Sequence, residues 1–417
     1  MFISGLSGNE VFCLAQKGLR PAEIAVGNSV RSLGIAGSLG SSLQTLAGGE
    51  IGNITQLISE GRHAAISRME EEARRHGAAG ITGVTSELTS LSGYVEFLSQ
   101  GTAVLTDSPR GGLFTTSASG ADLYCHLDAG YTPMRFVMGN VAYALGVGRG
   151  LTGGLRTMAK GEVKEYSEMY NRIRHLALWR LKEEAAAAGA NAVVDIAIEI
   201  KPFGPGIVEL LMTGTAAHHA RFSDGAVTPD RVVTSELTGT ELWNMAKLGW
   251  APIEMVMATS VYSIGIAGGL GTFFSGMKRG ELAELTKMVY EARENCLELV
   301  RREAIRLGAE QVIGNRLHIR ELSPGLIEII AVGTAIRRIP GIEPETAALL
   351  PQALVREDDP LAIAGAGMAG VMSSVQMGAA MQRRANPAGC LAIGLIVALS
   401  FGLAILGAIV SAFSHRR

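Results

Sequence analysis

Cysteine and histidine are the side chains of this sequence that could bind a soft metal ion, but they stand far apart. The four cysteines are Cys13, Cys125, Cys296 and Cys390. Zinc and copper sites are typically marked by such ligands at short spacings, because neighbouring ligands then converge on one ion. The best candidates are Cys125, His126, His218 and His219, which the first and last strands of one predicted sheet would bring together. Corresponding segments elsewhere in the chain lack this set, and the sequence therefore predicts no metal site.

Motifs for nucleophilic catalysis and phosphate binding are absent from the sequence. It contains no G-x-S-x-G nucleophile elbow and no recurring Cys–His pair. Glycine-rich stretches occur at residues 34–40, 146–150 and 265–271, but no Walker A Gly-Lys-Ser/Thr follows any of them. Such glycines are more typical of close backbone packing, within a domain or between subunits. The sequence therefore predicts no catalytic residue and no cofactor.

Two sets of glutamates recur at equivalent positions along the chain. Glu72, Glu184 and Glu303 lie near the end of a predicted long helix, where the helix dipole disfavours a carboxylate and a partner is required. The second set lies between apolar residues of a predicted strand and consists of Glu96, Glu209 and Glu328. These could form a ring of carboxylates at an oligomer seam or a pore, where they would bind a cation. The sequence favours a solvated strand face or ordinary salt bridges, because glutamate at alternate strand positions is common.

These positions are equivalent because the chain repeats one unit three times. Gly-x-x-Pro recurs at Gly18, Gly130 and Gly249, and Gly-Thr-Ala recurs at Gly101, Gly214 and Gly333. Between them stand a Gly-Glu pair and a Gly-Ala pair in every copy, at offsets of 112–113 and 119 residues. The sequence therefore predicts three domains of one kind, each of ordinary domain size, at residues 9–106, 120–220 and 235–338.

Each repeat is predicted to be an α+β unit, in which one long helix packs on a small antiparallel sheet. A short strand comes first, at Glu10–Leu14, Leu123–His126 and Glu241–Met245, and a glycine-rich amphipathic stretch follows it. The long helix is expected over roughly Ile51–His76, Val163–Ala188 and Leu282–Leu307, with glycine after its end. Two strands close the unit, and in the second repeat they are Ala192–Ile200 and Ile207–Thr213. Cys13 and Cys125 then become half-buried strand residues, and Cys296 belongs to the core stripe of the third helix.

The order and spacing of these motifs resemble the YbjQ-like family. The segments Gly189-Ala190-Asn191-Ala192-Val193-Val194 and Thr213-Gly214-Thr215-Ala216 carry the resemblance most clearly. It covers residues 9–340 and thus all three repeats. The resemblance implies a dodecin-like β-α-β-β unit and assembly of copies into rings, especially rings with five-fold symmetry. It implies no established reaction, and this chain supplies few ligands for the heavy metal that one name of the family mentions.

Composition excludes several classes of protein. Hydrophobic residues make up 47% and charged residues 18% of the 417 residues, which excludes a disordered chain. The net charge of −2 gives no basic field for nucleic acid to follow. Four cysteines in a chain of this length do not form a disulfide scaffold. The mean hydropathy of +0.25 is high for a soluble protein and indicates a membrane segment.

Residues 390–413 form an uncharged apolar run of 24 residues. As a helix this run would be about 36 Å long, enough to cross a hydrocarbon core of about 30 Å. We therefore expect a C-terminal transmembrane helix that acts as a single tail anchor. The N-terminus does not have the pattern of a signal peptide, so the repeats are expected in the cytoplasm. The anchor residues expected to contact lipid are Cys390, Leu391, Ile393, Leu395, Ile396, Phe401, Leu403, Ile405, Leu406 and Phe413.

A linker at residues 340–389 is expected between the third repeat and the anchor. It begins with prolines and acidic residues, which are typical of a polar linker. Residues 361–381 within it are rich in alanine, glycine and methionine. That segment could be an interfacial helix, a helix-packing segment of small residues or a flexible stalk.

Together these features favour a structural function. The sequence predicts a non-enzymatic, membrane-tethered scaffold in which the chain assembles with copies of itself into a ring or cage. The partners expected are therefore other copies of the chain and the lipid bilayer, and not nucleic acid. The alternative is a sensor or trafficking protein that binds a metal ion or a small ligand at the membrane. An enzyme with an unrecognised site is the third interpretation, and no set of polar residues supports it.

Overall fold

The computed structural model describes residues 3–32, 49–91, 93–107, 111–144, 161–204, 206–222, 225–263, 283–323 and 326–340. The chain divides into two units, Met1–Leu361 and Ala362–Arg417, and the first contains the three repeats. The glycine-rich stretches, most of the linker, the 361–381 segment and the anchor at 390–413 lie outside the described residues. Among the helices that are described, none combines the length and apolarity needed to span a membrane.

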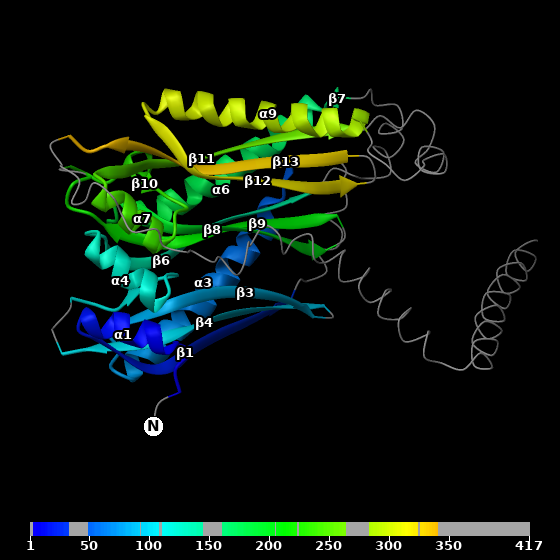
Figure 1. Ribbon diagram of the computed structural model, residues 1–417. Coiled ribbons are helices and arrows are strands. Elements are labelled where there is room, and N and C mark those ends of the chain that lie inside the picture. Colours follow the sequence, from blue (N-terminus) through cyan, green and yellow to red (C-terminus); the bar gives the residue numbers. More distant parts are fainter. Residues whose placement is uncertain are drawn as a thin grey trace, which may run out of the picture. The chain divides into compact units, whose positions relative to one another are not determined.

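The described residues confirm an α+β fold in which one set of elements recurs three times (Figure 1). The first repeat contains α1 (Gly8–Gln16), β1 (Leu19–Ser32), β2 (Gly49–Glu50), α3 (Gly52–Arg75), β3 (Gly80–Leu91) and β4 (Tyr94–Thr106). After β5 (Phe114–Thr115), the second contains α4 (Gly120–Asp128), β6 (Thr132–Ala144), β7 (Gly161–Glu162), α6 (Lys164–Ala187), β8 (Ala192–Gly204) and β9 (Ile207–His218). After η1 (Pro229–Arg231) and β10 (Val233–Thr234), the third contains α7 (Gly239–Lys247), β11 (Trp250–Ser263), α9 (Ala283–Arg306), β12 (Gln311–Ser323) and β13 (Leu326–Arg338).

The prediction of a short first strand in each repeat is wrong, because α1, α4 and α7 are helices there. Each of these helices follows a hydroxyl residue whose side chain accepts a hydrogen bond from the backbone N–H three residues later. These N-cap residues are Ser7, Ser119 and Thr238, and Ser7 and Thr238 complete a capping box with a glutamate. The caps satisfy N–H groups that a helix start leaves open, and so favour helix over strand. Cys13 and Cys125 therefore lie on helices and not on strands.

The first long strand of each repeat, β1, β6 or β11, lies between the first short element and the long helix. The sequence predicted no strand in this segment but only a glycine-rich amphipathic stretch. The three long strands pair antiparallel in the orders β1-β4-β3, β6-β9-β8 and β11-β13-β12. The chain order of long strand, helix and two strands thus agrees with the β-α-β-β unit that the family resemblance implies. The long helices begin and end within one or two residues of their predicted bounds. Each ends before a glycine with positive φ, at Gly77, Gly189 and Gly308.

In the first two repeats the backbone of the long helix lies very close to the backbone of the first long strand. A Cβ atom added at Gly27 or at Gly139 would lie 2.0 Å from a carbonyl oxygen of α3 or α6, respectively. Only glycine permits this approach, since any side chain at these positions would overlap the helix backbone. In the third repeat the equivalent residue is Ala258. The glycines therefore fix where the first two helices lie on their sheets.

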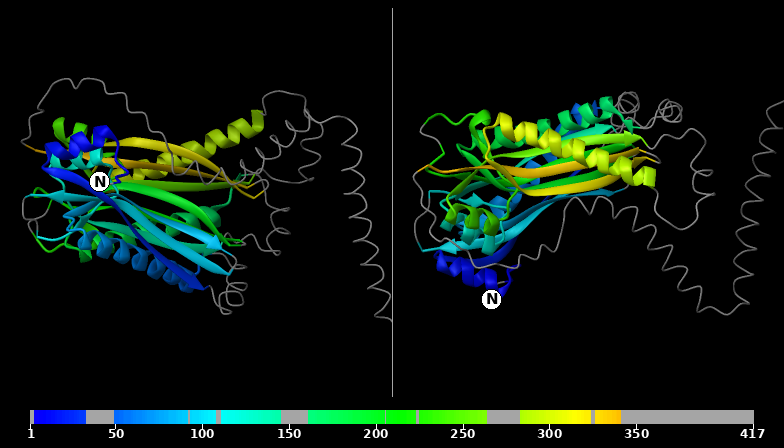
Figure 2. Two further views of the ribbon diagram at one scale, coloured as in Figure 1. Left: turned by 90° about the horizontal axis from the view of Figure 1, so that it is seen from below. Right: turned by 45° about the horizontal axis from the view of Figure 1, so that its top comes forward.

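Sheets and long helices alternate through the three repeats (Figures 1 and 2). Helix α3 lies between its own sheet and the sheet of the second repeat, and α6 is placed in the same way toward the third. Short strands cross these boundaries, since β2 pairs with β6 and β7 pairs with β11. The connections also join the sheets. Strands β5 and β10 pair with β3 and β8 of the preceding sheet, and their Thr115 and Thr234 hydroxyls accept hydrogen bonds from the backbone N–H groups of Phe136 and Met255 in the following sheet. Successive repeats are therefore interlocked by shared strands.

Candidate functional site: the junctions between repeats

A buried ion pair lies at the junction of the first and second repeats. Arg62 on α3 contacts Glu209 on β9 through two parallel hydrogen bonds, Nε to Oε1 at 3.0 Å and Nη2 to Oε2 at 2.7 Å. The remaining nitrogen, Nη1, donates to the carbonyl oxygen and to the hydroxyl of Ser86 on β3. Arg62 is 0% exposed and Glu209 is 1% exposed. Removing either partner would leave the other as an unpaired buried charge.

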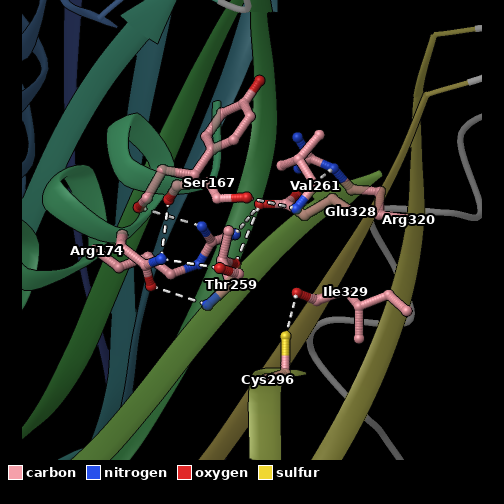
Figure 3. Close-up of polar contacts among 10 residues, drawn as sticks. Ser167, Arg174, Thr259, Val261, Cys296, Arg320, Glu328 and Ile329 are labelled. Carbon is pink, nitrogen blue, oxygen red and sulfur yellow. Dashed lines mark hydrogen bonds and ion pairs between the residues drawn. The ribbon is translucent and has the colours of Figure 1, made fainter. Parts of the chain in front are cut away.

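The junction of the second and third repeats contains the same pair. Arg174 on α6 donates from Nη2 to Oε1 of Glu328 on β13 at 2.7 Å, and both side chains are buried (Figure 3). Arg320 on β12 approaches the other oxygen of Glu328, with Nε 3.4 Å from Oε2. The hydroxyl of Thr259 lies 3.4 Å from Oε1. Two of the three glutamates that recur in the last strand, Glu209 and Glu328, thus form buried ion pairs at the junctions between repeats.

The starts of α3 and α6 are each bonded to the first strand of the following repeat. The backbone N–H of Ile51 donates to the carbonyl oxygen of Ala142 at 2.8 Å. In the same way, the backbone N–H of Val163 donates to the carbonyl oxygen of Val261 at 2.8 Å. One turn later a hydroxyl accepts from the same strand. The Ala142 N–H reaches Thr55 Oγ1, and the Val261 N–H reaches Ser167 Oγ, both at 2.9 Å (Figure 3). The helix thereby satisfies backbone groups that the two-residue strands β2 and β7 leave unpaired along the strand edge.

Apolar side chains from two repeats form a single core around the first junction. Ile51 before the start of α3, and Ile54 and Ile58 within it, pack in one cluster with residues of β6, β8 and β9 in the second repeat. Those residues are Ala142, Ala144, Phe203 and Ile207. The junction therefore buries apolar surface of both repeats together with the ion pair, and neither repeat encloses this core by itself.

The glutamates near the helix ends find their partner in a backbone amide. Glu72, Glu184 and Glu303 each accept a hydrogen bond from a strand N–H of their own repeat, donated by Val26, Met138 and Met257, respectively. Glu184 also contacts His63 of the first repeat, with Oε1 2.8 Å from Nε2. This contact raises the pKa of His63, because the hydrogen bond favours the charged ring. Burial raises the pKa of Glu303 to about 7.

The best candidates for metal ligands come from two elements of the second repeat. Cys125 and His126 lie on α4, and His219 follows β9, with the ring of Tyr131 beside both histidines. His218 is exposed. Among the described residues no group of three or more histidine, cysteine and acidic side chains could hold a metal ion. Cys296 is buried in the core of the third repeat, where burial raises the pKa of its thiol to about 11.

His126 is a buried histidine whose two ring nitrogens find no hydrogen-bond partner within the described part of the chain. It is 1% exposed, and this burial lowers its pKa to about 4, because an imidazolium there would lose its hydration. The neighbouring Asp122 acts in the opposite direction. His126 therefore acts as a neutral core residue near pH 7.

The arginines of the junctions are the residues that sequence analysis missed. Arg62 and Arg174 occupy equivalent positions of two repeats, and Arg293 occupies that position in the third. A positive charge that recurs on the helix, together with a negative charge that recurs on the last strand, was the available signal. It could have been found by comparing the repeats for opposite charges and not only for carboxylates.

The family model described as "Putative heavy-metal-binding", YbjQ_1, matches residues 17–107, 131–220 and 250–338. The chain belongs to this family. A relative from Mycobacterium tuberculosis, named "Encapsulin nanocompartment protein Rv1762c", is 31% identical over 245 residues, which cover 56% of this chain and 91% of that protein. A UPF0145 protein from Methanoregula boonei is 43% identical over 81 residues, 19% of this chain and 68% of that protein. A UPF0145 protein from Vibrio campbellii is 40% identical over 80 residues, 19% of this chain and 77% of that protein.

Replacing Glu209 by glutamine should destabilise the protein through the first junction. Glu209→Gln leaves the charge of Arg62 buried without a carboxylate, and we expect the free energy of unfolding to fall by about 3 kcal/mol. Urea denaturation followed by circular dichroism measures this change. The matched control is Glu71→Gln on the exposed side of α3, for which we expect a change below about 0.5 kcal/mol. Equal midpoints for the two variants would contradict a stabilising role of the pair.

His126 should make the stability of the protein sensitive to acid. Its pKa is about 4 in the folded chain and near 6.5 when unfolded, so between these values the unfolded chain binds more protons. Stability from this group is present above pH 6.5 and is lost as the pH falls toward 4, by at most about 3 kcal/mol. Thermal unfolding at pH 7 and pH 5 should therefore show a smaller acid loss for His126→Leu than for the unaltered protein. An identical loss in both would show that His126 is not held neutral by burial.

Proposed function

We propose that this chain is a non-enzymatic scaffold that assembles with copies of itself and is held to a membrane by residues 390–413. The observation that carries the proposal is the junction between repeats. The same buried ion pair, shared short strand and helix-to-strand hydrogen bonds occur twice within one chain. A unit whose faces join to another copy of the same unit is suited to build larger bodies by repetition.

The comparison with the mycobacterial relative supports the same function. Its name describes a protein of an encapsulin nanocompartment, and the similarity covers 91% of its length. We propose that the present chain likewise contributes to a ring or a cage-like body built from many copies. Five-fold symmetry, which the family resemblance implies, stays a prediction.

A cavity between β3 and β8 supports a function without catalysis. It has a volume of about 350 Å³, and Ser117, Asp195 and Lys201 are among the residues that line it. The Ser117 hydroxyl donates to Asp195 Oδ2 at 3.1 Å, and Lys201 pairs with Glu199. Ser117 thus has an acidic partner but no histidine in this lining that would act as a general base toward it. The polar groups of the cavity join two sheets, and we propose that this contact is structural.

The membrane tether is supported by the sequence of residues 390–413. An uncharged apolar run of 24 residues is long enough to span a bilayer as a helix. Several anchors in one assembly would strengthen its attachment, because each bound anchor raises the effective concentration of the others at the membrane. We propose that the repeats face the cytoplasm on such an anchor.

The scaffold function predicts a large discrete assembly. When the full-length protein is solubilised in detergent, light scattering should give a mass many times the 43.8 kDa of one chain. Electron microscopy of the same sample should show closed particles of uniform size. A species with the mass of a single chain would overturn the scaffold function.

Truncation should separate the assembly from the membrane. A chain that ends at residue 385 loses the anchor, while the separate unit with the repeats stays intact. We expect this variant in the supernatant after centrifugation of a membrane preparation, with the unaltered protein in the pellet. Deletion of 361–381 alone is the matched control and should leave the protein in the pellet. A truncated protein that still pellets with membranes would contradict an anchor at 390–413.

A further inference from the structure

The stack of repeats ends in two faces that have no counterpart within the described chain. Helix α9 contacts its own sheet, as α3 and α6 do, but no described sheet covers its other side (Figures 1 and 2). Among the described elements, the sheet of the first repeat likewise has a long helix on one face and none on the other. These two faces are called here the helix end, formed by α9 and β12, and the sheet end, formed by β1 and β4.

We propose that the helix end of one chain binds the sheet end of a second copy through the same junction that joins the repeats within a chain. This inference rests on the proposed function and names the surface by which copies assemble. Such a contact uses two different faces, so it is heterologous, and each chain can bind one neighbour at either end.

Apolar residues of the sheet end are exposed where their equivalents are buried. Ile24, Val26 and Val30 of β1 are 38%, 42% and 55% exposed. In the two other sheets the equivalent residues are at most 3% exposed. They are Phe136, Met138 and Ala142 of β6, and Met255, Met257 and Val261 of β11. Three large apolar side chains in one row on a solvent-facing strand indicate a surface that another element covers.

The helix end has a matching set of exposed apolar residues. Leu317 and Ile319 of β12 are 37% and 47% exposed, whereas the equivalent Ile198 and Ile200 of β8 are 5% and 4% exposed. Tyr290 of α9 is 61% exposed, on the side where Asn171 of α6 contacts the following repeat. The two ends therefore expose apolar surface at the positions that the inner junctions bury.

The charges of the two ends complete the ion pair of the junction. Arg293 on α9 is equivalent to Arg62 and Arg174, and Glu96 on β4 is equivalent to Glu209 and Glu328. Arg293 is exposed and Glu96 is half-buried, and neither forms an ion pair with any residue in the described ranges. If α9 of one copy packed on β1 and β4 of the next, Arg293 would lie where Glu96 neutralises it.

A second pair of positions also carries opposite charges. Lys182 on α6 contacts Glu254 on β11 at 3.1 Å across the second junction. The equivalents at the two ends are Arg301 on α9 and Glu23 on β1. Arg301 now contacts Glu298, and Glu23 contacts His76, in exposed ion pairs that contribute little stability and can exchange partners.

The helix end also keeps the hydroxyl that accepts a strand N–H at each inner junction. Thr286 on α9 is equivalent to Thr55 and Ser167, and it is exposed. Those two hydroxyls accept from the N–H groups of Ala142 and Val261, whose equivalent on β1 is Val30. In the proposed contact, Thr286 would accept a hydrogen bond from the backbone N–H of Val30 in the next copy.

One charged position makes this junction weaker than the inner ones. Glu294 stands where the inner helices have His63 and His175. His63 contacts Glu184 across the first junction, and the equivalent of Glu184 in the first repeat is Glu72, on α3 beside β1 of the sheet end. Glu294 would therefore approach a like charge, which opposes binding. The contact between chains is expected to dissociate before the repeats within a chain separate.

Charge reversal tests the proposed contact in the full-length, detergent-solubilised protein. We expect Glu96→Arg or Arg293→Glu alone to raise the dissociation constant between chains at least about tenfold, because like charges then meet. The double variant, and an equimolar mixture of the two single variants, should restore assembly, since each then contains opposite charges at the contact. Glu71→Arg makes the same charge change on the exposed side of α3 and should leave assembly unchanged. Sedimentation velocity measures the masses, and circular dichroism shows that each variant is folded.

The outcomes separate this contact from the scaffold function. If the single variants assemble as well as the unaltered protein, or if the double variant does not recover, the Arg293–Glu96 contact is wrong, and the scaffold function stands. If the unaltered protein has the mass of one chain, the scaffold function and the contact are both wrong. Loss in each single variant with recovery in the double variant supports the contact.

Discussion

The structure depends on an arginine that its own repeat does not neutralise. Arg62 and Arg174 are buried on the inner sides of long helices, where their own repeats supply neutral acceptors, from Ser86 and from the Tyr170 carbonyl, respectively. The carboxylate that balances each charge comes from the last strand of the following repeat. A buried charge without a partner is far more costly than a buried pair. Burial of this arginine therefore requires the next repeat to be in place, and on α9, which no described sheet covers, the equivalent Arg293 is exposed.

This requirement explains why the repeats are interlocked and not merely adjacent. The short strands β2 and β7 leave their own repeats and pair with the sheet of the next one, and the following helix begins there. The helix start is thus fixed by the neighbouring sheet, and the arginine three turns later is placed opposite its glutamate. Shape, hydrogen bonds and charge all specify the same register between two repeats. Such agreement among independent interactions is what selects one arrangement over others.

The sequence predicted the parts of the fold that depend on local signals. Glycine after the helix end and the apolar stripe of the helix placed the long helices to within one or two residues, because both act within a few residues of the chain. The first elements were mistaken for strands although Ser7 with Glu10, and Thr238 with Glu241, form a readable capping signal. The ion pairs could not be derived in this way. Arg62 and Glu209 are 147 positions apart, and only the packing of a helix between two sheets brings them together.

Differences among the repeats follow from where each junction lies. The inner junctions are formed by segments of one chain, so each repeat meets its neighbour at a high effective concentration and the contact needs little further selection. A contact between chains has no such advantage, and it must also reject wrong partners. The third helix keeps Thr286 and Arg293, the hydroxyl and the charge whose positions specify the register, but carries Glu294 where the inner helices have a histidine. This replacement exchanges a favourable contact for a repulsive one and leaves the register unchanged. A junction of this kind retains its specificity while its stability falls, so chains joined in a wrong arrangement can separate and bind again.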